Sequence, residues 1–249
     1  MADRETRRLS FGSVATDYDR YRPSPPPQAL DWLIPPGARA VLDLAAGTGA
    51  VTRELIGRAP RVIAVEPDER MRAVLTARCP EAEVLAGRGE DIPLPDASVD
   101  AVVISSAWHW LDPEVAVPEI TRVLRVDAIL GVMWISRDMR VPWVTEFNQL
   151  ARESREADRG PAGRRRREVT FAPGTPLSPV EQHTVEFWLP MTKDELAGLL
   201  GTYSGVITLD PGRRADFARR VRAFLDRQPW DRTDLPLICR CLRSRRLAG

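Results

Sequence analysis

The feature that most constrains the fold is the stretch Val41-Leu42-Asp43-Leu44-Ala45-Ala46-Gly47-Thr48-Gly49. An apolar run meets an acidic residue, a turn of small residues follows, and residues 50–58 then show a helical pattern. This order is typical of a buried parallel strand, a tight turn and a helix start. Small side chains let a ligand approach the backbone, and a helix N-terminus exposes unpaired N–H groups. The turn is therefore a candidate binding site.

A second apolar run, residues 61–65, leads to Glu66. In nucleotide-binding α/β folds, an acidic residue at the tip of the neighbouring strand holds a ribose diol. The alternative is a charge placed near the start of the next helix, before Asp68. The position of Glu66 after the glycine turn favours the ribose interpretation. For Asp43 we expect a structural role, capping the following helix or orienting the turn, together with an indirect contact with a cofactor.

The main alternative interpretation of this strand–turn–helix motif is a dinucleotide-binding dehydrogenase. Its fingerprint, G-x-G-x-x-G, needs a third glycine, whereas Val51 and Thr52 follow Gly49 in this chain. The motif therefore disfavours a nicotinamide site.

Composition narrows the class of protein. The 249 residues, with 43% hydrophobic and 29% charged residues, suit a single domain, 1–249. A formal net charge of +1 gives no electrostatic case for a nucleic-acid or membrane partner. The 3 cysteines lack C-x-x-C spacing and there are 2 histidines, so we expect neither disulfides nor a metal site. The sequence has no signal-peptide core near Met1 and no membrane-spanning run, which predicts a cytoplasmic protein. Arginine dominates the basic residues, which indicates a GC-rich bacterial genome.

Residues 40–136 alternate between strand and helix patterns and form the predicted cofactor-binding half. The strands are expected at 40–45, 61–66, 82–86, 99–105 and 128–135, and the helices at 49–58, 68–78 and 113–124. Continuous apolar strands separated by helices predict a parallel sheet covered on both faces. The segment 1–39 before them predicts two short helices, which form either a lid or a packing layer over the sheet edge.

The rest of the chain is less regular. Residues 137–186 are interpreted as an insertion that shapes a substrate pocket, with a helix at 143–153 and the run Arg164-Arg165-Arg166-Arg167, either a phosphate site or a solvated loop. The part 187–249 predicts C-terminal helices and a last strand. The expected elements are a strand from Glu181, a helix at 192–201 with Thr192 and Glu195 in capping-box spacing, a helix at 211–227 and a strand at 235–242.

Six motifs follow one another in a characteristic order. They are Phe11 to Tyr18-Asp19-Arg20-Tyr21-Arg22-Pro23, the stretch 41–49, Val65-Glu66-Pro67, Gly89-Glu90-Asp91-Ile92-Pro93-Leu94-Pro95-Asp96, Ala107-Trp108-His109-Trp110 and Met133-Trp134-Ile135-Ser136-Arg137-Asp138. In this order and spacing the chain resembles the class I S-adenosylmethionine-dependent methyltransferases. Within them it is most similar to the branch of trans-aconitate methyltransferases and small-molecule type 11 enzymes.

The resemblance implies a Rossmann-like α/β fold. Its sheet has seven strands, mostly parallel, in the order 3-2-1-4-5-7-6, with a reversed final strand, helices on both faces, an N-terminal helical lid and an insertion after strand five. The implied cofactor is S-adenosyl-L-methionine, and the product is S-adenosyl-L-homocysteine. By resemblance the glycine turn contacts the methionine and ribose end, Glu66 holds both ribose hydroxyls, and Gly89-Glu90 recognises the adenine edge. The expected cofactor residues are Tyr21, Arg22, Asp43, Ala45, Gly47, Thr48, Gly49, Glu66, Pro67, Gly89, Glu90, Ser105 and Ser106.

Two positions depart from the family pattern. Ala45 stands where the glycine-rich turn usually has its first glycine, a change small enough to keep binding. The segment Leu124-Arg125-Val126-Asp127-Ala128-Ile129 replaces the usual Leu-Arg-Pro-Gly-Gly. Because glycines serve the turn into strand five, we expect an altered loop there.

His109 has two interpretations, a general base acting on a hydroxyl or a packed residue that shapes the pocket. Aromatic residues near the ends of strands four and five suggest a partly apolar substrate pocket, although core packing is the alternative for at least half of them. Arg137 is a candidate clamp for an acidic group. The expected substrate residues are Trp108, Trp110, Trp134, Arg137 and Trp143.

The sequence thus predicts an S-adenosylmethionine-dependent enzyme that methylates a small molecule, at a carboxylate or hydroxyl oxygen, by direct displacement at the sulfonium. An enzyme of the same fold that catalyses a reaction such as cyclisation is one alternative. A non-catalytic, cofactor-binding partner subunit is the other. The acceptor and the oligomeric state are not encoded in any motif that we recognise.

Overall fold

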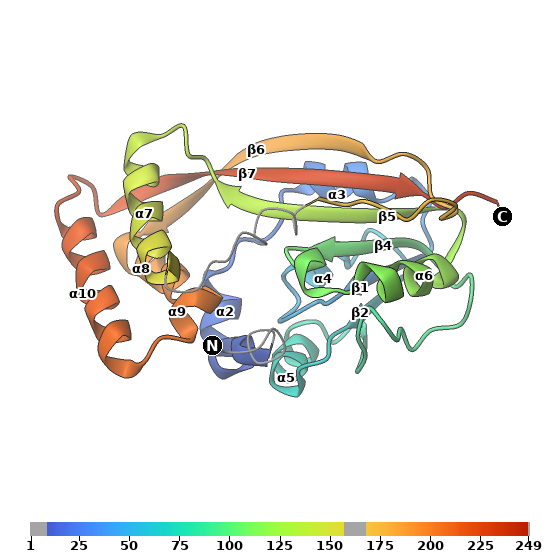
Figure 1. Ribbon diagram of the computed structural model, residues 1–249, viewed down its shortest axis with the longest axis horizontal. Helices are drawn as coiled ribbons and strands as arrows, with labels where there is room; N and C mark the ends of the chain where they lie inside the picture. Colours follow the sequence, from blue (N-terminus) through green and yellow to red (C-terminus); the bar gives the residue numbers. More distant parts are fainter. Residues whose placement is uncertain (1–8, 157–167, 249) are drawn as a thin grey trace. The chain divides into compact units, whose positions relative to one another are not determined.

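The computed structural model describes residues 9–156 and 168–248 (Figure 1). The run Arg164–Arg167 falls outside these residues. In chain order the elements are η1 (Leu9–Val14), α2 (Ala15–Tyr21), α3 (Pro27–Leu33), β1 (Ala40–Leu44), α4 (Ala50–Leu55), β2 (Arg61–Val65), α5 (Glu69–Arg78), β3 (Glu83–Leu85), β4 (Val99–Ser105), η2 (Trp108–Trp110), α6 (Pro113–Val123), β5 (Leu124–Arg137), α7 (Pro142–Glu156), β6 (Glu181–Thr192), α8 (Lys193–Gly201), α9 (Ser204–Ile207), α10 (Pro211–Asp226) and β7 (Arg232–Arg245).

Seven strands form one sheet in the order β3-β2-β1-β4-β5-β7-β6. The pairs β1–β2, β1–β4, β2–β3 and β4–β5 are parallel. β7 runs antiparallel to β5: the N–H of Asp127 donates to the carbonyl of Arg246, and the N–H of Asp138 donates to the carbonyl of Pro236. The predicted strand order and the reversed final strand are confirmed.

Side chains of β2 alternate between two hydrophobic clusters. Ile63 and Val65 belong to a cluster that includes Ile120 of α6. Ala64, between them, packs with Leu75 of α5 in a separate cluster. Because successive side chains of a strand point to opposite faces, α6 and α5 cover the two faces of the sheet, as the sequence predicts.

The chain divides into two compact units. The sheet unit comprises Ser24–Ile135, Arg165–Val185 and Cys239–Gly249, and the helical unit comprises Met1–Pro23, Ser136–Arg164 and Glu186–Ile238. Of the helices expected before the first strand, α2 belongs to the helical unit and α3 to the sheet unit. The division of one domain into 1–39, 40–136, 137–186 and 187–249, and the role of the first segment as a lid, stay predictions.

The predicted start of strand five, at Ala128, is wrong. β5 begins at Leu124, which pairs with Val99, and the register then shifts so that Ala101 pairs with Ile129. Asp127 lies within this bulge at a φ of 65°. Aspartate tolerates this left-handed conformation better than most residues, so the segment without glycines forms a bulged strand instead of a free loop.

Other boundaries differ for local reasons. The helix expected at 49–58 ends at Leu55, because Gly57 takes a left-handed φ of 84° that stops it. The last strand is longer than predicted and spans Arg232–Arg245. α9 was not expected, since a helix of one turn leaves almost no periodic pattern.

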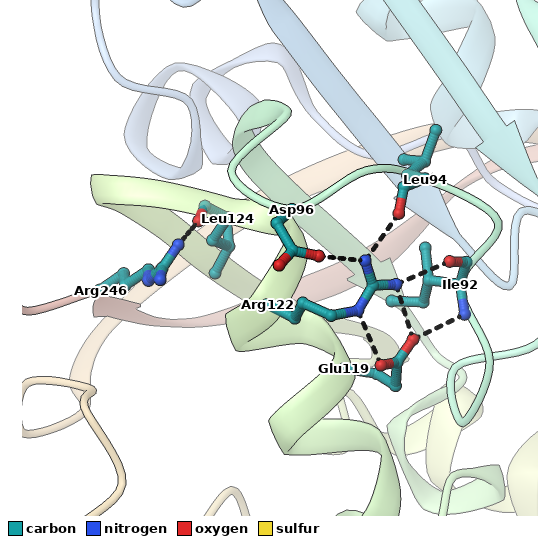
Figure 2. A network of polar contacts seen from close by, with 7 residues as sticks. All are labelled: Ile92, Leu94, Asp96, Glu119, Arg122, Leu124 and Arg246. Atoms are coloured by element: carbon teal, nitrogen blue, oxygen red, sulfur yellow. Dashed lines mark hydrogen bonds and ion pairs between the residues drawn. The ribbon is translucent and has the colours of Figure 1, made fainter. Parts of the chain in front are cut away.

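The loop that carries the 89–96 motif is fixed to α6 by one arginine (Figure 2). Arg122 donates to the carbonyls of Ile92 and Leu94 at 2.9 and 2.8 Å, and it is paired with Asp96 at 2.8 Å. Glu119, which also pairs with Arg122, accepts the N–H of Ile92 at 3.1 Å. Backbone groups of Ile92 and Leu94 are therefore bonded to α6 side chains.

In the helical unit, α2 packs closely on α8. α8 starts with the predicted capping box between Thr192 and Glu195, which is confirmed. A Cβ added at Gly198 would lie 2.4 Å from Cε2 of Tyr21. Next to it, Arg22 donates from Nε to Oγ1 of Thr202 at 3.0 Å and from Nη2 to the Thr202 carbonyl at 2.9 Å.

We predict that Gly198→Ala lowers the free energy of unfolding by about 1–3 kcal/mol, because the new methyl group must displace the Tyr21 ring. Gly201→Ala, in the same helix with no atom within 4 Å of an added Cβ, is the matched control and should be neutral or slightly stabilising. Urea denaturation measures both variants. Equal effects at the two positions would contradict the close packing.

Candidate active site

The turn after β1 is held in left-handed backbone conformations. φ is 61° at Ala45, 60° at Gly47 and 89° at Gly49. A Cβ at Gly49 would lie 2.4 Å from Cδ1 of Leu75, so glycine is required there for α5 to pack against the turn. Ala45 adopts the glycine-like conformation despite its side chain, which explains how the turn keeps its shape without the first glycine.

Glu66 joins this turn to the loop after β2. One carboxylate oxygen, Oε2, accepts the N–H of Gly47 at 2.9 Å, and the other, Oε1, accepts the N–H of Asp68 at 2.9 Å. Burial raises the pKa of Glu66, and the two backbone N–H groups oppose the rise. Arg72 holds the adjacent backbone by donating to the carbonyls of Glu66 and Pro67. Each carboxylate oxygen can accept a further hydrogen bond.

Asp43 lies in β1, just before the turn, and is buried. Its neighbours in register are Ala64 on β2 and Val103 on β4. The hydroxyl of Thr52, on α4, donates to its Oδ2 at 2.6 Å. Burial raises the pKa of Asp43 to about 7, and the hydrogen bonds from Thr52 oppose the rise. Asp43 therefore ties α4 to the strand, and its predicted indirect contact with a cofactor stays a prediction.

The Gly89-Glu90 segment packs tightly against the end of η2. A Cβ at Gly89 would lie 2.7 Å from Cδ2 of Leu111, and Oε1 of Glu90 accepts the N–H of Asp112 at 2.9 Å. Two polar atoms of the predicted site, Oε2 of Glu90 and Oγ1 of Thr48, are buried and have no hydrogen-bond partner in the part of the chain that the structure describes. A ligand rich in N–H and O–H groups would satisfy these atoms.

β4 ends in a turn that carries polar and aromatic residues. Ser105 and Ser106 are half-buried, and Ser106 has a φ of 55°. η2 follows, with Trp108 buried in the core and the ring of His109 centred 4.7 Å from that of Trp110. The central strands β1, β2 and β4 thus all end in predicted site residues, at the edge where parallel sheets bind ligands.

The structure places the predicted site residues in two groups. The sheet unit holds Asp43, Ala45, Gly47, Thr48, Gly49, Glu66, Pro67, Gly89, Glu90, Ser105, Ser106, Trp108, His109, Trp110 and Trp134. The helical unit holds Tyr21, Arg22, Arg137 and Trp143. Trp108 and Trp134 are core residues of the sheet unit, and the ring of Trp143 packs edge-on against Trp230 with centroids 5.3 Å apart.

Known proteins that are similar to this chain are methyltransferases. The family described as "Methyltransferase domain" matches residues 42–132. A protein of Mycobacterium tuberculosis H37Rv, described as an uncharacterized methyltransferase, is 42% identical over 240 residues, which is 95% of each chain. The present chain belongs to the methyltransferase family.

Two further proteins are similar to this chain. A probable S-adenosylmethionine-dependent methyltransferase of M. tuberculosis is 32% identical over 166 residues, 66% of this chain and 47% of that protein. A solved structure from Anaeromyxobacter dehalogenans, provisionally named a type II methyltransferase, shares the fold with a TM-score of 0.63 at 24% identity, covering 92% of this chain and 100% of that one. This methyltransferase is a class I, S-adenosylmethionine-dependent enzyme.

Several supporting residues escaped the sequence reasoning. Thr52 donates a hydrogen bond to Asp43. Arg72 donates to the carbonyls of Glu66 and Pro67. Arg122 holds the 92–96 loop. No motif marks them, and single arginines carry little information in a chain this rich in arginine. Among the described residues, no group of His, Cys, Asp and Glu could hold a metal ion, and no helix is long and apolar enough to cross a membrane.

We predict that Asp43 makes stability depend on pH. Its pKa of about 7 in the folded protein exceeds the ordinary aspartate value of 3.8, so the folded methyltransferase holds this proton more tightly than the unfolded chain does. The contribution is fully present below about pH 4 and is lost as the pH rises through about 7. Chemical denaturation of wild type and Asp43→Asn across this range should show the difference in unfolding free energy falling by a few kcal/mol, at about 1.4 kcal/mol per pKa unit.

Asp100→Asn is the contrasting control. Although burial opposes it, the hydrogen bond from Arg125 lowers the pKa of Asp100 below 3.8. Its contribution should therefore persist at neutral pH and be lost only as the pH falls through the lowered pKa. A wild-type minus Asp43→Asn difference that is flat between pH 4 and 8 would show that Asp43 is ionised throughout.

Proposed function

We propose that this methyltransferase transfers a methyl group to an oxygen of a small molecule, a carboxylate or a hydroxyl, by direct displacement. The observation that carries the proposal is the position of His109 in η2, the short helical turn that follows the end of β4 at Ser105. Imidazole is the side chain best suited to proton transfer near neutral pH. The other histidine, His183, is exposed on β6, where its ring stacks on Trp32 with centroids 5.4 Å apart.

The cofactor is assigned to the residues that gather in the sheet unit. Glu66 would accept hydrogen bonds from both ribose hydroxyls. Each of its carboxylate oxygens accepts one backbone N–H and can accept a further hydrogen bond. The Gly47–Gly49 turn would hold the methionine end, Gly89-Glu90 the adenine edge, and Ser105 and Ser106 the methionine part. When bound, S-adenosylmethionine supplies an activated methyl group and leaves as S-adenosylhomocysteine. The buried, unpartnered oxygens of Thr48 and Glu90 support this assignment.

Methyl transfer to oxygen requires positioning of the acceptor and, for some acceptors, removal of a proton. A carboxylate acceptor needs no base, so positioning the acceptor in line is the main task. A hydroxyl acceptor must lose its proton, which His109 would accept. Trp110, Arg137 and Trp143 are proposed substrate residues, and Tyr21 and Arg22 are proposed cofactor residues.

We further propose that the substrate is a small molecule in the cytoplasm and not nucleic acid. The formal net charge of +1 supports this, because neutralising a phosphate backbone requires a strong excess of basic charge.

We predict that Glu66→Ala weakens the binding of S-adenosylhomocysteine about 10- to 100-fold, the loss of a charged hydrogen-bond acceptor worth roughly 1–3 kcal/mol. Isothermal titration calorimetry measures the change. Glu69→Ala, an exposed residue in the first turn of α5, is the control and should bind as the wild type does. Unchanged affinity in Glu66→Ala would place the ribose elsewhere, and no binding to the wild type would remove the cofactor assignment.

The reaction is tested by following S-adenosylhomocysteine formation with panels of carboxylic acids and of alcohols and phenols. We predict that His109→Asn lowers kcat about 10²- to 10⁴-fold with hydroxyl acceptors, the usual contribution of general-base catalysis, and much less with carboxylates. His183→Asn should leave both rates unchanged. Equal losses for the two acceptor classes would show that His109 shapes the pocket and does not transfer a proton.

The same assay separates the alternative reactions. A cyclase of this fold would convert its substrate without forming S-adenosylhomocysteine. A non-catalytic subunit would bind the cofactor and turn over neither panel.

A further inference from the structure

We propose that the substrate carries a carboxylate group that the guanidinium of Arg137 binds as an anchor. This inference rests on the proposed function, because it specifies the substrate class of the same enzyme. The contacts that support it all lie in the helical unit, where Arg137 contacts residues of α7 and of the segment between α8 and α9.

Arg137 is unusual in its burial. Its exposed fraction is 9%, and it is the one arginine among the buried polar residues of the described chain. Nη2 donates to Oδ1 of Asn148 at 2.6 Å. Nη1 is fully buried and has no hydrogen-bond partner within residues 9–156 and 168–248.

No carboxylate in the described residues pairs with Arg137. The adjacent Asp138 is occupied by Arg140 at 2.7 Å. The guanidinium instead faces two aromatic rings, with its Cζ 5.6 Å from the ring centre of Phe147 and 5.0 Å from that of Tyr203. Aromatic faces offset only part of the cost of desolvating a cation. A buried charge without an anionic partner is therefore left undercompensated.

A second guanidinium reinforces the positive charge. The Cζ of Arg22 lies 4.4 Å from the ring centre of the same Tyr203. Arg22 donates to the hydroxyl and carbonyl of Thr202, and it too has no ion pair in the described part of the chain. Two cations thus contact one tyrosine, and neither forms an ion pair with an acid among the described residues, which favours an anionic ligand.

The shape of the group points to a carboxylate. A guanidinium is planar, and its parallel N–H bonds match the two oxygens of a carboxylate. The rings of Phe147 and Tyr203 suit the apolar body of an organic acid better than a strongly hydrated inorganic anion. Because oxygens held by a guanidinium are weaker nucleophiles, the bound carboxylate is an anchor, and a different oxygen accepts the methyl group.

The test is calorimetric binding of benzoate and succinate in the presence of saturating S-adenosylhomocysteine, with benzamide and succinamide as neutral counterparts. At least one acid should bind the wild type and both amides should not. Arg137→Met keeps the length of the side chain and removes the charge, so it should weaken acid binding at least tenfold. Arg140→Met is the matched control, because Arg140 is exposed and already paired with Asp138 and Glu186, and it should bind as the wild type does.

Folding is controlled in two ways. If the charge of Arg137 is uncompensated, Arg137→Met without ligand should unfold at an equal or higher denaturant concentration than the wild type. Arg137→Lys, which keeps the charge and loses the planar fork, should also lose at least tenfold in acid binding, and it serves if Arg137→Met does not fold. Binding of S-adenosylhomocysteine should be unchanged in both variants.

The outcomes separate the two proposals. A wild type that does not bind S-adenosylhomocysteine contradicts the cofactor assignment. If it binds S-adenosylhomocysteine but neither acid, or if the Arg137 variants bind acids as tightly as the wild type, the carboxylate anchor is overturned. A strongly destabilised Arg137→Met would mean that a group of the protein itself compensates the guanidinium.

Discussion

The carboxylate of Glu66 is the interaction on which the proposed site depends. It accepts one backbone N–H from the glycine turn after β1 and one from the loop after β2, so it sets the spacing between the ends of two neighbouring strands. Burial raises its pKa, and the backbone donors keep the carboxylate in a defined orientation. The left-handed turn, the glycine contact with α5 and the Arg72 bonds all serve to hold this group in place.

Two further sets of contacts hold the elements around the Glu66 site in place. Asp43 and Thr52 tie α4 to the central strand beneath the turn. Arg122 and Glu119 tie the 92–96 loop to α6 (Figure 2). A few buried polar atoms of the site, among them Oγ1 of Thr48 and Oε2 of Glu90, have no hydrogen-bond partner in the described part of the chain, as expected for a site that is completed by a ligand. The helical unit has a different character, because its central feature is a buried cation faced by aromatic rings.

The sequence predicts the sheet well and the supporting contacts poorly, for physical reasons. Continuous apolar runs such as 61–65 are legible because both faces of a parallel strand are buried. The start of β5 was missed because Asp127 adopts a conformation usually reserved for glycine, and α9 is too short to show a period. The roles of Thr52, Arg122 and Arg137 depend on distances across the fold, which local patterns do not encode.

The most direct test of the account is a crystal structure of the protein with S-adenosylhomocysteine bound. We predict that the Glu66 carboxylate accepts hydrogen bonds from both ribose hydroxyls while it keeps the N–H of Gly47, with the adenine against Gly89-Glu90. A complex in which the ribose hydroxyls contact other residues, or in which Glu66 remains bonded only to the backbone, would contradict the central claim.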